Sequence, residues 1–216
     1  MAPRFRSVAL DVDSTLSALE GIDWLAQRRG EAVAAHVERL TRDAMDGKAM
    51  LDAVYAERLA MVAPSRDDMA ALGEAYVAAL VPGAREAITS WQAAGVRVVL
   101  VSGGLRPGIE PLASAVGVSH ADLHAADLDF APDGRYAGVD PRQPLATPRG
   151  KALVLRVLAL PRPLLVVGDG STDAEARTEA DAFCAFTGVV RRDAVVARAD
   201  FVADDFSAVT RLVLPT

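Results

Sequence analysis

The sequence has little of several features that mark particular protein classes. It contains one cysteine in 216 residues, and aromatic residues make up 5% of the chain. A lone cysteine, Cys184 in the apolar segment FCAF, excludes a disulfide framework and a metal site built from several thiolates, and it suits a reducing cytosol. We therefore expect Cys184 to be a small, buried hydrophobic residue.

Long apolar runs and an excess of positive charge are also missing. The apolar run near the N-terminus meets Asp11 far short of the length of a signal-peptide core or a membrane span. The 23 basic and 29 acidic residues give a formal net charge of -6, so no overall basic character is available to neutralise a phosphate backbone. These absences predict a cytoplasmic protein, a monomer or homodimer, that binds neither nucleic acid nor membrane.

The residues that are present predict an α/β fold. Hydrophobic residues make up 51% of the chain and charged residues 24%, which is ample for a compact domain. Continuous apolar runs, typical of strands covered on both faces, are SVAL (7–10), VRVVLV (96–101) and PLLVVG (163–168). Stretches with helical spacing lie between them: PGAREAITSWQAAG (82–95), PGIEPLASAVG (107–117) and GKALVLRVLAL (150–160). Strands that alternate with helices indicate a doubly wound parallel sheet.

Two segments depart from this alternation. Residues 17–80 are rich in alanine and helical in pattern, with no strand candidate, so we expect a small helical cap inserted after the first strand. The catalytic core would then comprise residues 1–16 and 81–216. The segment DLDFAPDGRYAGV (127–139) has alternating apolar residues around a Pro-Asp-Gly turn, which predicts a β-hairpin.

Two carboxylates follow the first predicted strand. Asp11 and Asp13 are two residues apart, so in an extended chain their side chains point the same way and can meet one ligand. A turn or a helix cap also explains many Asp-x-Asp pairs. Because ligands of an open α/β sheet bind beyond the carboxyl ends of its strands, this pair should face a crevice under the cap.

Further polar groups follow the other predicted strands or begin the following helix. Ser102 and Gly103 offer a hydroxyl and an unhindered amide to a phosphoryl group, although an ordinary strand-to-helix turn has the same composition. Lys151 lies at the start of a helix, where a positive charge is disfavoured by the helix dipole. Opposite a phosphate, the same lysine would neutralise negative charge. Asp169 and Asp173, in GDGSTD, suit a hard cation such as Mg²⁺. The glycines do not form the G-x-G-x-x-G pattern of a dinucleotide-binding fold.

In this order, the four motifs resemble those of the haloacid dehalogenase superfamily, and within it the phosphoserine phosphatase family. The resemblance covers nearly the whole chain. Segments similar to that family are EGIDWLA (20–26), ERLAMVAPSR (57–66), SGGLRP (102–107), DGRYAGVD (133–140) and ADAFCAFTGVVRRD (180–193). It implies a Rossmann-type core and the Mg²⁺-dependent hydrolysis of O-phospho-L-serine to serine and phosphate, the last step of serine biosynthesis.

The resemblance also implies roles for the motif residues. Asp11 would be the nucleophile that forms an aspartyl phosphate and a ligand of Mg²⁺, and Asp13 the acid and base that also binds the metal through its main-chain carbonyl. Asp169 would be the third metal ligand, and Asp173 would support the metal site. Ser102, Gly103 and Lys151 would hold the phosphoryl oxygens.

Recognition of the amino-acid part of the substrate would fall to the cap side. By resemblance, Glu20 faces the serine ammonium, Arg58 grips its carboxylate and Met45 makes an apolar contact. An arginine can bind a carboxylate through two parallel hydrogen bonds, which suits this assignment. Thr172 stands where many relatives have asparagine, and we place it among the substrate-binding residues.

Three other functions are compatible with parts of this pattern. A phosphatase for another small phosphomonoester would share every phosphoryl-binding motif but would not require Glu20 and Arg58. A signalling receiver domain also has a phosphorylatable aspartate, a hydroxyl and a lysine, but it has no use for a helical lid or for a second carboxylate placed as an acid. An inactive binding protein would have lost a motif residue, and here all are present.

Overall fold

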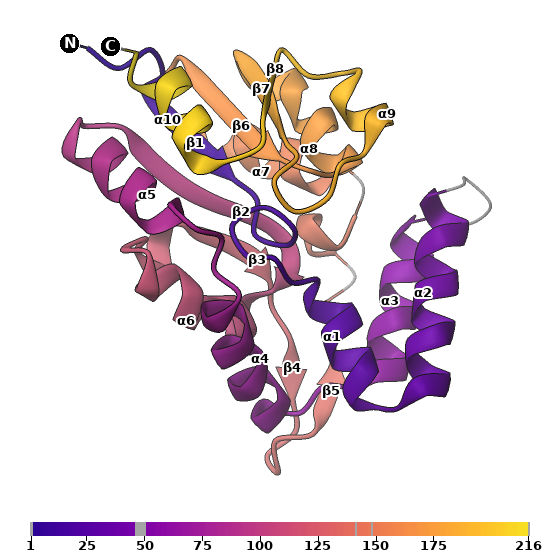
Figure 1. Cartoon of the computed structure of the whole chain (residues 1–216). Coiled ribbons are helices and arrows are strands. Elements are labelled where there is room, and N and C mark those ends of the chain that lie inside the picture. Colours follow the sequence, from indigo (N-terminus) through magenta and orange to yellow (C-terminus); the bar gives the residue numbers. More distant parts are fainter. Residues whose placement is uncertain (1, 46–50, 141, 148, 216) are drawn as a thin grey trace.

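Six parallel strands form the central sheet of the computed structural model, which describes residues 2–45, 51–140, 142–147 and 149–215 (Figure 1). The strands are β1 (Ser7–Leu10), β2 (Arg97–Leu105), β3 (Leu123–Ala126), β6 (Leu164–Gly168), β7 (Ala182–Phe186) and β8 (Phe201–Ala203). Their order is β3-β2-β1-β6-β7-β8, so β1 lies in the interior between β2 and β6. The predicted doubly wound parallel sheet is confirmed, and the three apolar runs form β2, β1 and β6, three adjacent strands in its interior.

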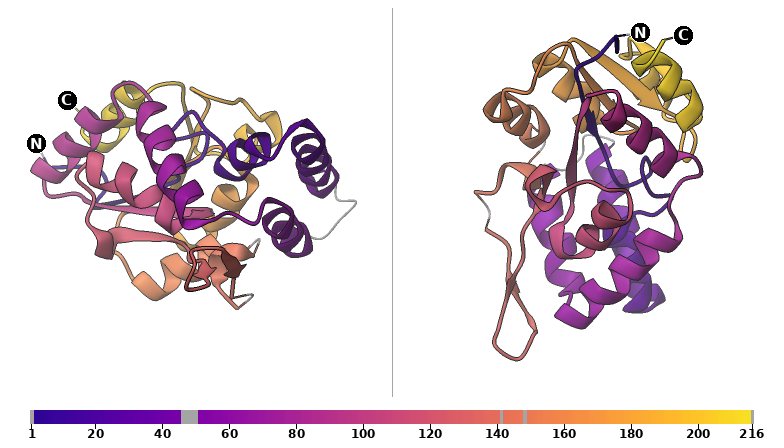
Figure 2. Two further views of the ribbon diagram at one scale, coloured as in Figure 1. Left: turned by 90° about the horizontal axis from the view of Figure 1, so that it is seen from below. Right: turned by 90° about the vertical axis from the view of Figure 1, so that its left-hand side faces the viewer.

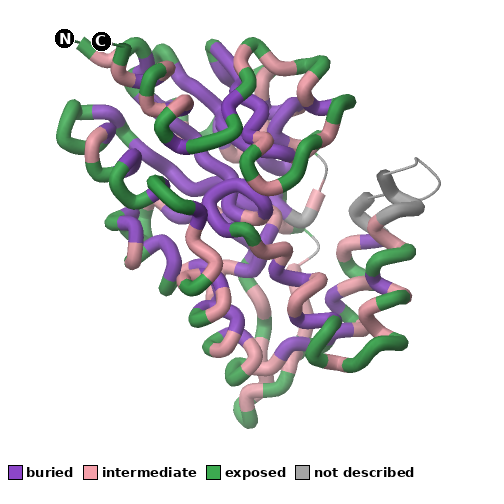
Figure 3. Tube along the Cα trace, in the orientation of Figure 1, coloured by how far each residue is buried: buried purple, intermediate pink, exposed green. Residues whose placement is uncertain are grey.

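Helices cover both faces of this sheet (Figure 2). They are α5 (Ala84–Ala93), α6 (Arg106–Ala115) and α10 (Phe206–Val213) on one face, and α7 (Gly150–Leu158), α8 (Ser171–Ala176) and α9 (Asp193–Val196) on the other. Successive residues of a strand point to opposite faces. Val8 and Leu10 therefore pack with the first group, and Ala9 packs with the second. Figure 3 shows the resulting buried centre of the molecule.

In the described part of the chain, four helices lie between β1 and α5, where the sequence predicted an insertion. They are α1 (Gly21–Arg28), α2 (Glu31–Met45), α3 (Leu51–Val62) and α4 (Arg66–Ala78). The first three pack on one another and project from the sheet, whereas α4 lies along α6 (Figure 1). Gly73 of α4 and Gly108 of α6 each leave a gap that a side chain of the other helix fills, Pro111 and Leu72 respectively. The fourth helix is thus held against the core while the other three overhang it.

The predicted hairpin is also present, as β4 (Asp129–Phe130) and β5 (Tyr136–Gly138), which pair antiparallel. Short 3₁₀ helices complete the chain at His120–Asp122, Pro144–Ala146 and Arg177–Glu179. Cys184 is fully buried in β7 with a free thiol, as predicted, and burial raises the pKa of that thiol to about 12. Among the described residues, no helix combines the length and apolarity needed to cross a lipid bilayer.

A single arginine joins the overhanging helices to α4. Arg29, just after α1, donates from Nε to the carbonyl of Val62 at the end of α3 (2.8 Å). Its two terminal nitrogens meet the two carboxylate oxygens of Asp68 in α4, at 3.1 and 2.5 Å. Asp68 also accepts from the backbone amide of Ser65 and completes a capping box at the start of α4. Its pKa is held well below the ordinary value, chiefly by the hydrogen bonds from Arg29.

We predict that Asp68→Ala lowers the free energy of unfolding by about 1–3 kcal/mol near neutral pH, because it removes the Asp68 half of the capping box and leaves the partly buried Arg29 guanidinium without its carboxylate partner. Chemical denaturation measures the difference. The pKa of Asp68 is depressed in the folded state, so its contribution is complete above the ordinary pKa of about 4 and declines as the pH falls below it. The neighbouring, exposed Asp67 provides the control. An equal loss in Asp67→Ala would contradict the structural argument.

Candidate active site

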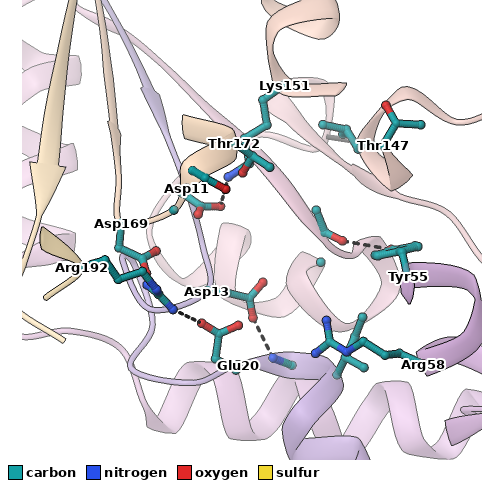
Figure 4. Close-up of a pocket in the computed structure, with 17 residues that line it drawn as sticks. Asp11, Asp13, Glu20, Tyr55, Arg58, Thr147, Lys151, Asp169, Thr172 and Arg192 are labelled. Atoms are coloured by element: carbon teal, nitrogen blue, oxygen red, sulfur yellow. Dashed lines mark hydrogen bonds and ion pairs between the residues drawn. The ribbon is translucent and has the colours of Figure 1, made fainter. Parts of the chain in front are cut away.

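The polar side chains that follow the central strands converge on one cavity of about 230 Å³ (Figure 4). Of the residues predicted for the site, those that line it are Asp11, Asp13, Glu20, Arg58, Gly103, Lys151, Asp169 and Thr172. Ser102 and Asp173 are buried directly behind this wall. Met45 is the last residue of α2, and its side chain lies outside the described part of the structure.

Lys151 forms the electrostatic centre of the site. Its ammonium lies 2.7 Å from Oδ1 of Asp11 and 2.7 Å from Oδ1 of Asp173, and all three side chains are buried. Burial alone would lower the pKa of Lys151, but the two carboxylates outweigh it and raise the pKa above its ordinary value. Lys151 is therefore a permanent cation between two acids. The position of the lysine at the start of α7 is the one expected from its sequence.

Asp11, Asp169 and Asp173 form a compact cluster of carboxylates. They come from the ends of β1 and β6 and from α8, and one oxygen of each lies within 4.8 Å of the others. Burial, followed by the charge of Asp11, raises the pKa of Asp173 to about 7. Hard oxygen donors at this spacing fit a divalent cation, whose charge would relieve the repulsion among the carboxylates. Asp13 takes no part in this side-chain cluster.

Asp13 lies in a different environment from Asp11, although only one residue separates them. Its Oδ1 accepts hydrogen bonds from the hydroxyl of Tyr76 and from the backbone amide of Gly21, each at 2.7 Å. Burial and the nearby charge of Glu20 raise the pKa of Asp13 to about 7. Burial and the charge of Asp13 raise the pKa of Tyr76 well above its ordinary value, so the phenol remains a donor.

Charged residues from the helical insertion form the far wall of the cavity. Glu20 accepts a hydrogen bond from Ser14 (2.7 Å), and burial raises its pKa. Arg58 donates to Asp23 (2.7 Å), while its Nε is buried and has no hydrogen-bond partner among the described residues. An anion and a cation thus face the same cavity, as an amino acid headgroup requires.

The sequence motifs did not assign every residue of the site, and Arg192, Tyr55 and Tyr76 are among those they missed. Arg192, before α9, contacts Asp169 and lies 3.5 Å from Glu20. Tyr55 lies one helical turn before Arg58 and donates its hydroxyl to the carbonyl of Gly103 (3.0 Å). Tyr76 is the donor to Asp13 described above. The sequence held a signal for Arg192 and for Tyr55. Arg192 falls within the segment 180–193, which resembles the phosphatase family, and Tyr55 lies three residues before Arg58, a spacing that places both on one helix face.

Comparison with known proteins agrees with this geometry. The family model described as haloacid dehalogenase-like hydrolase matches residues 8–176. Among curated proteins, the phosphoserine phosphatase of Bos taurus is 39% identical over 203 residues, covering 93% of this chain and 89% of its own length. The chloroplastic phosphoserine phosphatase of Arabidopsis thaliana is 34% identical over 207 residues, covering 94% of this chain and 70% of its own length.

Solved structures show the same fold. A phosphoserine phosphohydrolase-like protein from Francisella tularensis subsp. tularensis SCHU S4 superposes with a TM-score of 0.87 at 21% identity, over 97% of this chain and all of that protein. A structure described as a phospho-aspartyl intermediate analogue of phosphoserine phosphatase superposes with a TM-score of 0.78 at 23% identity, over 96% of this chain and 98% of the other.

The carboxylate cluster predicts that divalent cations stabilise the fold. At a cation concentration about 100 times the Kd, binding contributes roughly 2.7 kcal/mol, which for a chain of this size raises the Tm by about 5–10 °C. Thermal unfolding in EDTA and after cation addition measures this shift. Asp169→Asn should reduce it to below about 2 °C, whereas Glu86→Gln, an exposed change on α5, should leave it intact. A full shift in Asp169→Asn would exclude Asp169 as a ligand.

Proposed function

Because this chain belongs to the haloacid dehalogenase-like hydrolases and, among them, to the phosphoserine phosphatase family, we propose how its cavity hydrolyses O-phospho-L-serine. The observation that carries the proposal is that Asp11 and Asp13 have different surroundings. Asp11 lies against a buried cation, and Asp13 lies in a separate hydrogen-bonded niche with a pKa of about 7. One strand end therefore supplies both a nucleophile and an acid.

In the first step, a carboxylate oxygen of Asp11 attacks the phosphorus atom. The bond from phosphorus to the serine oxygen breaks, and that oxygen takes a proton from Asp13, so L-serine leaves and an acyl phosphate remains on Asp11. In the second step, water attacks the phosphorus while Asp13 accepts its proton. Phosphate leaves and the Asp11 carboxylate is restored. A pKa near 7 suits a group that must donate a proton and then accept one.

The transferred phosphoryl group carries negative charge on its oxygens, which the site must neutralise. Lys151 already lies beside the nucleophile, and Ser102, Gly103 and Thr172 complete the cradle in this proposal. Mg²⁺ would be held by Asp11, Asp169 and the main-chain carbonyl of Asp13, with Asp173 in support. When bound, this cation supplies electrostatic stabilisation of the phosphoryl oxygens.

Recognition of serine uses the two charges on the insertion side. Glu20 faces the ammonium of the substrate, and Arg58, whose Nε has no partner within the described residues, faces the carboxylate. Met45 would add an apolar contact from the end of α2. In this arrangement the segment 17–80 acts as the cap of a core made of residues 1–16 and 81–216, and α1, α2 and α3 are its overhanging part.

Asp11→Asn should abolish turnover with almost no change in shape, because the amide is not a nucleophile of comparable strength. We expect less than about one thousandth of the wild-type kcat, since residues of covalent catalysis carry orders of magnitude. Acid quenching with ³²P-labelled substrate should trap label on the wild-type protein and none on the variant. More than about a tenth of the wild-type rate in Asp11→Asn would place the chemistry elsewhere.

Arg58→Ala tests the identity of the substrate. If Arg58 binds the serine carboxylate, its loss leaves that anion unpaired, which costs about 2–5 kcal/mol, or roughly 30-fold or more in kcat/KM for L-phosphoserine. The aryl ester p-nitrophenyl phosphate has no such carboxylate and should be hydrolysed almost as before. Lys151→Ala should impair both substrates, because both present the same phosphoryl group.

The exposed Arg28 of α1 offers a matched control for this comparison, since it lies on the same insertion outside the cavity. Arg28→Ala should leave both substrates unaffected. If Arg58→Ala depressed the two substrates equally, the arginine would be structural, and a phosphatase of another phosphomonoester would become the better interpretation.

A further inference from the structure

The two oxygens of the Asp13 carboxylate face different surroundings. Oδ1 is turned into the protein, where the Tyr76 hydroxyl and the Gly21 amide both donate to it. Oδ2 lies beside the Ser102–Gly104 turn, 3.4 Å from Oγ of Ser102, and a Cβ atom added at Gly104 would come within 2.7 Å of it. Only Oδ2 therefore borders the loop where the phosphoryl group is proposed to bind.

Tyr76 is built rigidly into the core side of the insertion. Its side chain is fully buried, and its carbonyl accepts a hydrogen bond from Oγ of Ser17 (3.2 Å). The helix that carries it, α4, is the one packed along α6. Gly21 leaves the space that the phenol occupies, since a Cβ atom there would lie 2.1 Å from the Tyr76 oxygen. This packing therefore places the Tyr76 hydroxyl next to Oδ1 of Asp13, to which it donates.

A carboxylic acid has one proton to give, and the oxygen that already accepts two hydrogen bonds is the poorer place to carry it. We propose that Tyr76 is a positioning residue for the reaction: with the Gly21 amide it holds Oδ1 of Asp13, so that Oδ2 carries the transferred proton. This inference rests on the proposed function, in which Asp13 protonates the leaving oxygen and later accepts a proton from water. Tyr76 keeps its own proton throughout both steps.

The consequence differs between leaving groups. The serine oxygen leaves as an alcohol and needs the proton as its bond to phosphorus breaks. The nitrophenolate ion is a stable leaving group and needs little help. Loss of the correct orientation of Asp13 should therefore penalise alkyl phosphates far more than aryl phosphates, whereas a general loosening of the site should penalise both alike.

Tyr76→Phe tests this, because it removes the hydroxyl and keeps the buried ring. We expect kcat/KM for L-phosphoserine to fall about 10-fold or more, within the range that general acid catalysis supplies, while p-nitrophenyl phosphate changes less than about 3-fold. Thr210→Val is the matched control, since it removes the hydrogen bond from Trp91 (3.2 Å) elsewhere in the core. It should leave the ratio between the two substrates unchanged.

A double-mutant cycle with Asp13→Asn supplies a second test, read as the rate of phosphoenzyme formation from labelled L-phosphoserine in a single turnover. If Tyr76 acts through Asp13, then Tyr76→Phe should change the rate less than about twofold in the Asp13→Asn background. Equal losses on both substrates, no loss on L-phosphoserine, or full additivity in the cycle would each overturn the proposal.

Failure of the proposed function would look different. If the wild-type protein did not hydrolyse L-phosphoserine, that function would be wrong, and the same comparison with glycerol phosphate as the alkyl ester would still test Tyr76. A selective loss on glycerol phosphate would support the positioning role, and equal losses on the alkyl and aryl esters would refute it.

Discussion

The site depends on one buried ammonium among carboxylates. Asp11, Asp169 and Asp173 end up within 4.8 Å of one another because two parallel strands and the start of a helix open at the same sheet edge. Such a cluster repels itself when it is buried, and the Lys151 ammonium, at 2.7 Å from two of its members, offsets that repulsion. The Arg192 guanidinium contacts the third member, Asp169. Neutralisation is still incomplete, since three acids face two cations, and the residual negative charge suits the cluster to a divalent cation.

The same strand end also separates two chemical tasks. In the proposed mechanism, the carboxylate paired with the Lys151 ammonium attacks phosphorus. Burial and the charge of Glu20 raise the pKa of the other carboxyl, Asp13, to about 7. Asp11 and Asp13 have these contrasting environments because the chain turns away from the sheet between them. Asp11 stays at the end of β1, where it contacts Lys151 of α7. Asp13 lies next to α4, where it accepts a hydrogen bond from Tyr76.

The insertion supplies residues to the site from two parts that pack differently, and its helical sequence pattern does not distinguish these parts. Its last helix, α4, packs along α6 and supplies Tyr76 from a fixed position. Its first three helices overhang the cavity and bring Tyr55 and Arg58 toward the turn formed by Ser102, Gly103 and Gly104. The contacts of Arg29 with Val62 and Asp68 join the two parts. In the proposed mechanism, catalytic positioning and substrate recognition therefore fall to separately packed pieces of one insertion.

The local sequence determined the three central strands, the helices between them, the hairpin and the motif residues, because period and composition act over short stretches of chain. It did not identify β3, β7 and β8 as strands. β3 (LHAA) includes a histidine and β8 has three residues, so neither forms a long apolar run, and the segment around Cys184 in β7 was expected only to be buried. The tertiary structure alone decided which carboxylate of the Asp11–Asp13 pair faces Lys151, that Tyr76 reaches Asp13, and that α4 packs along α6. These contacts join residues far apart in the chain, through helix packing whose partners no local pattern encodes.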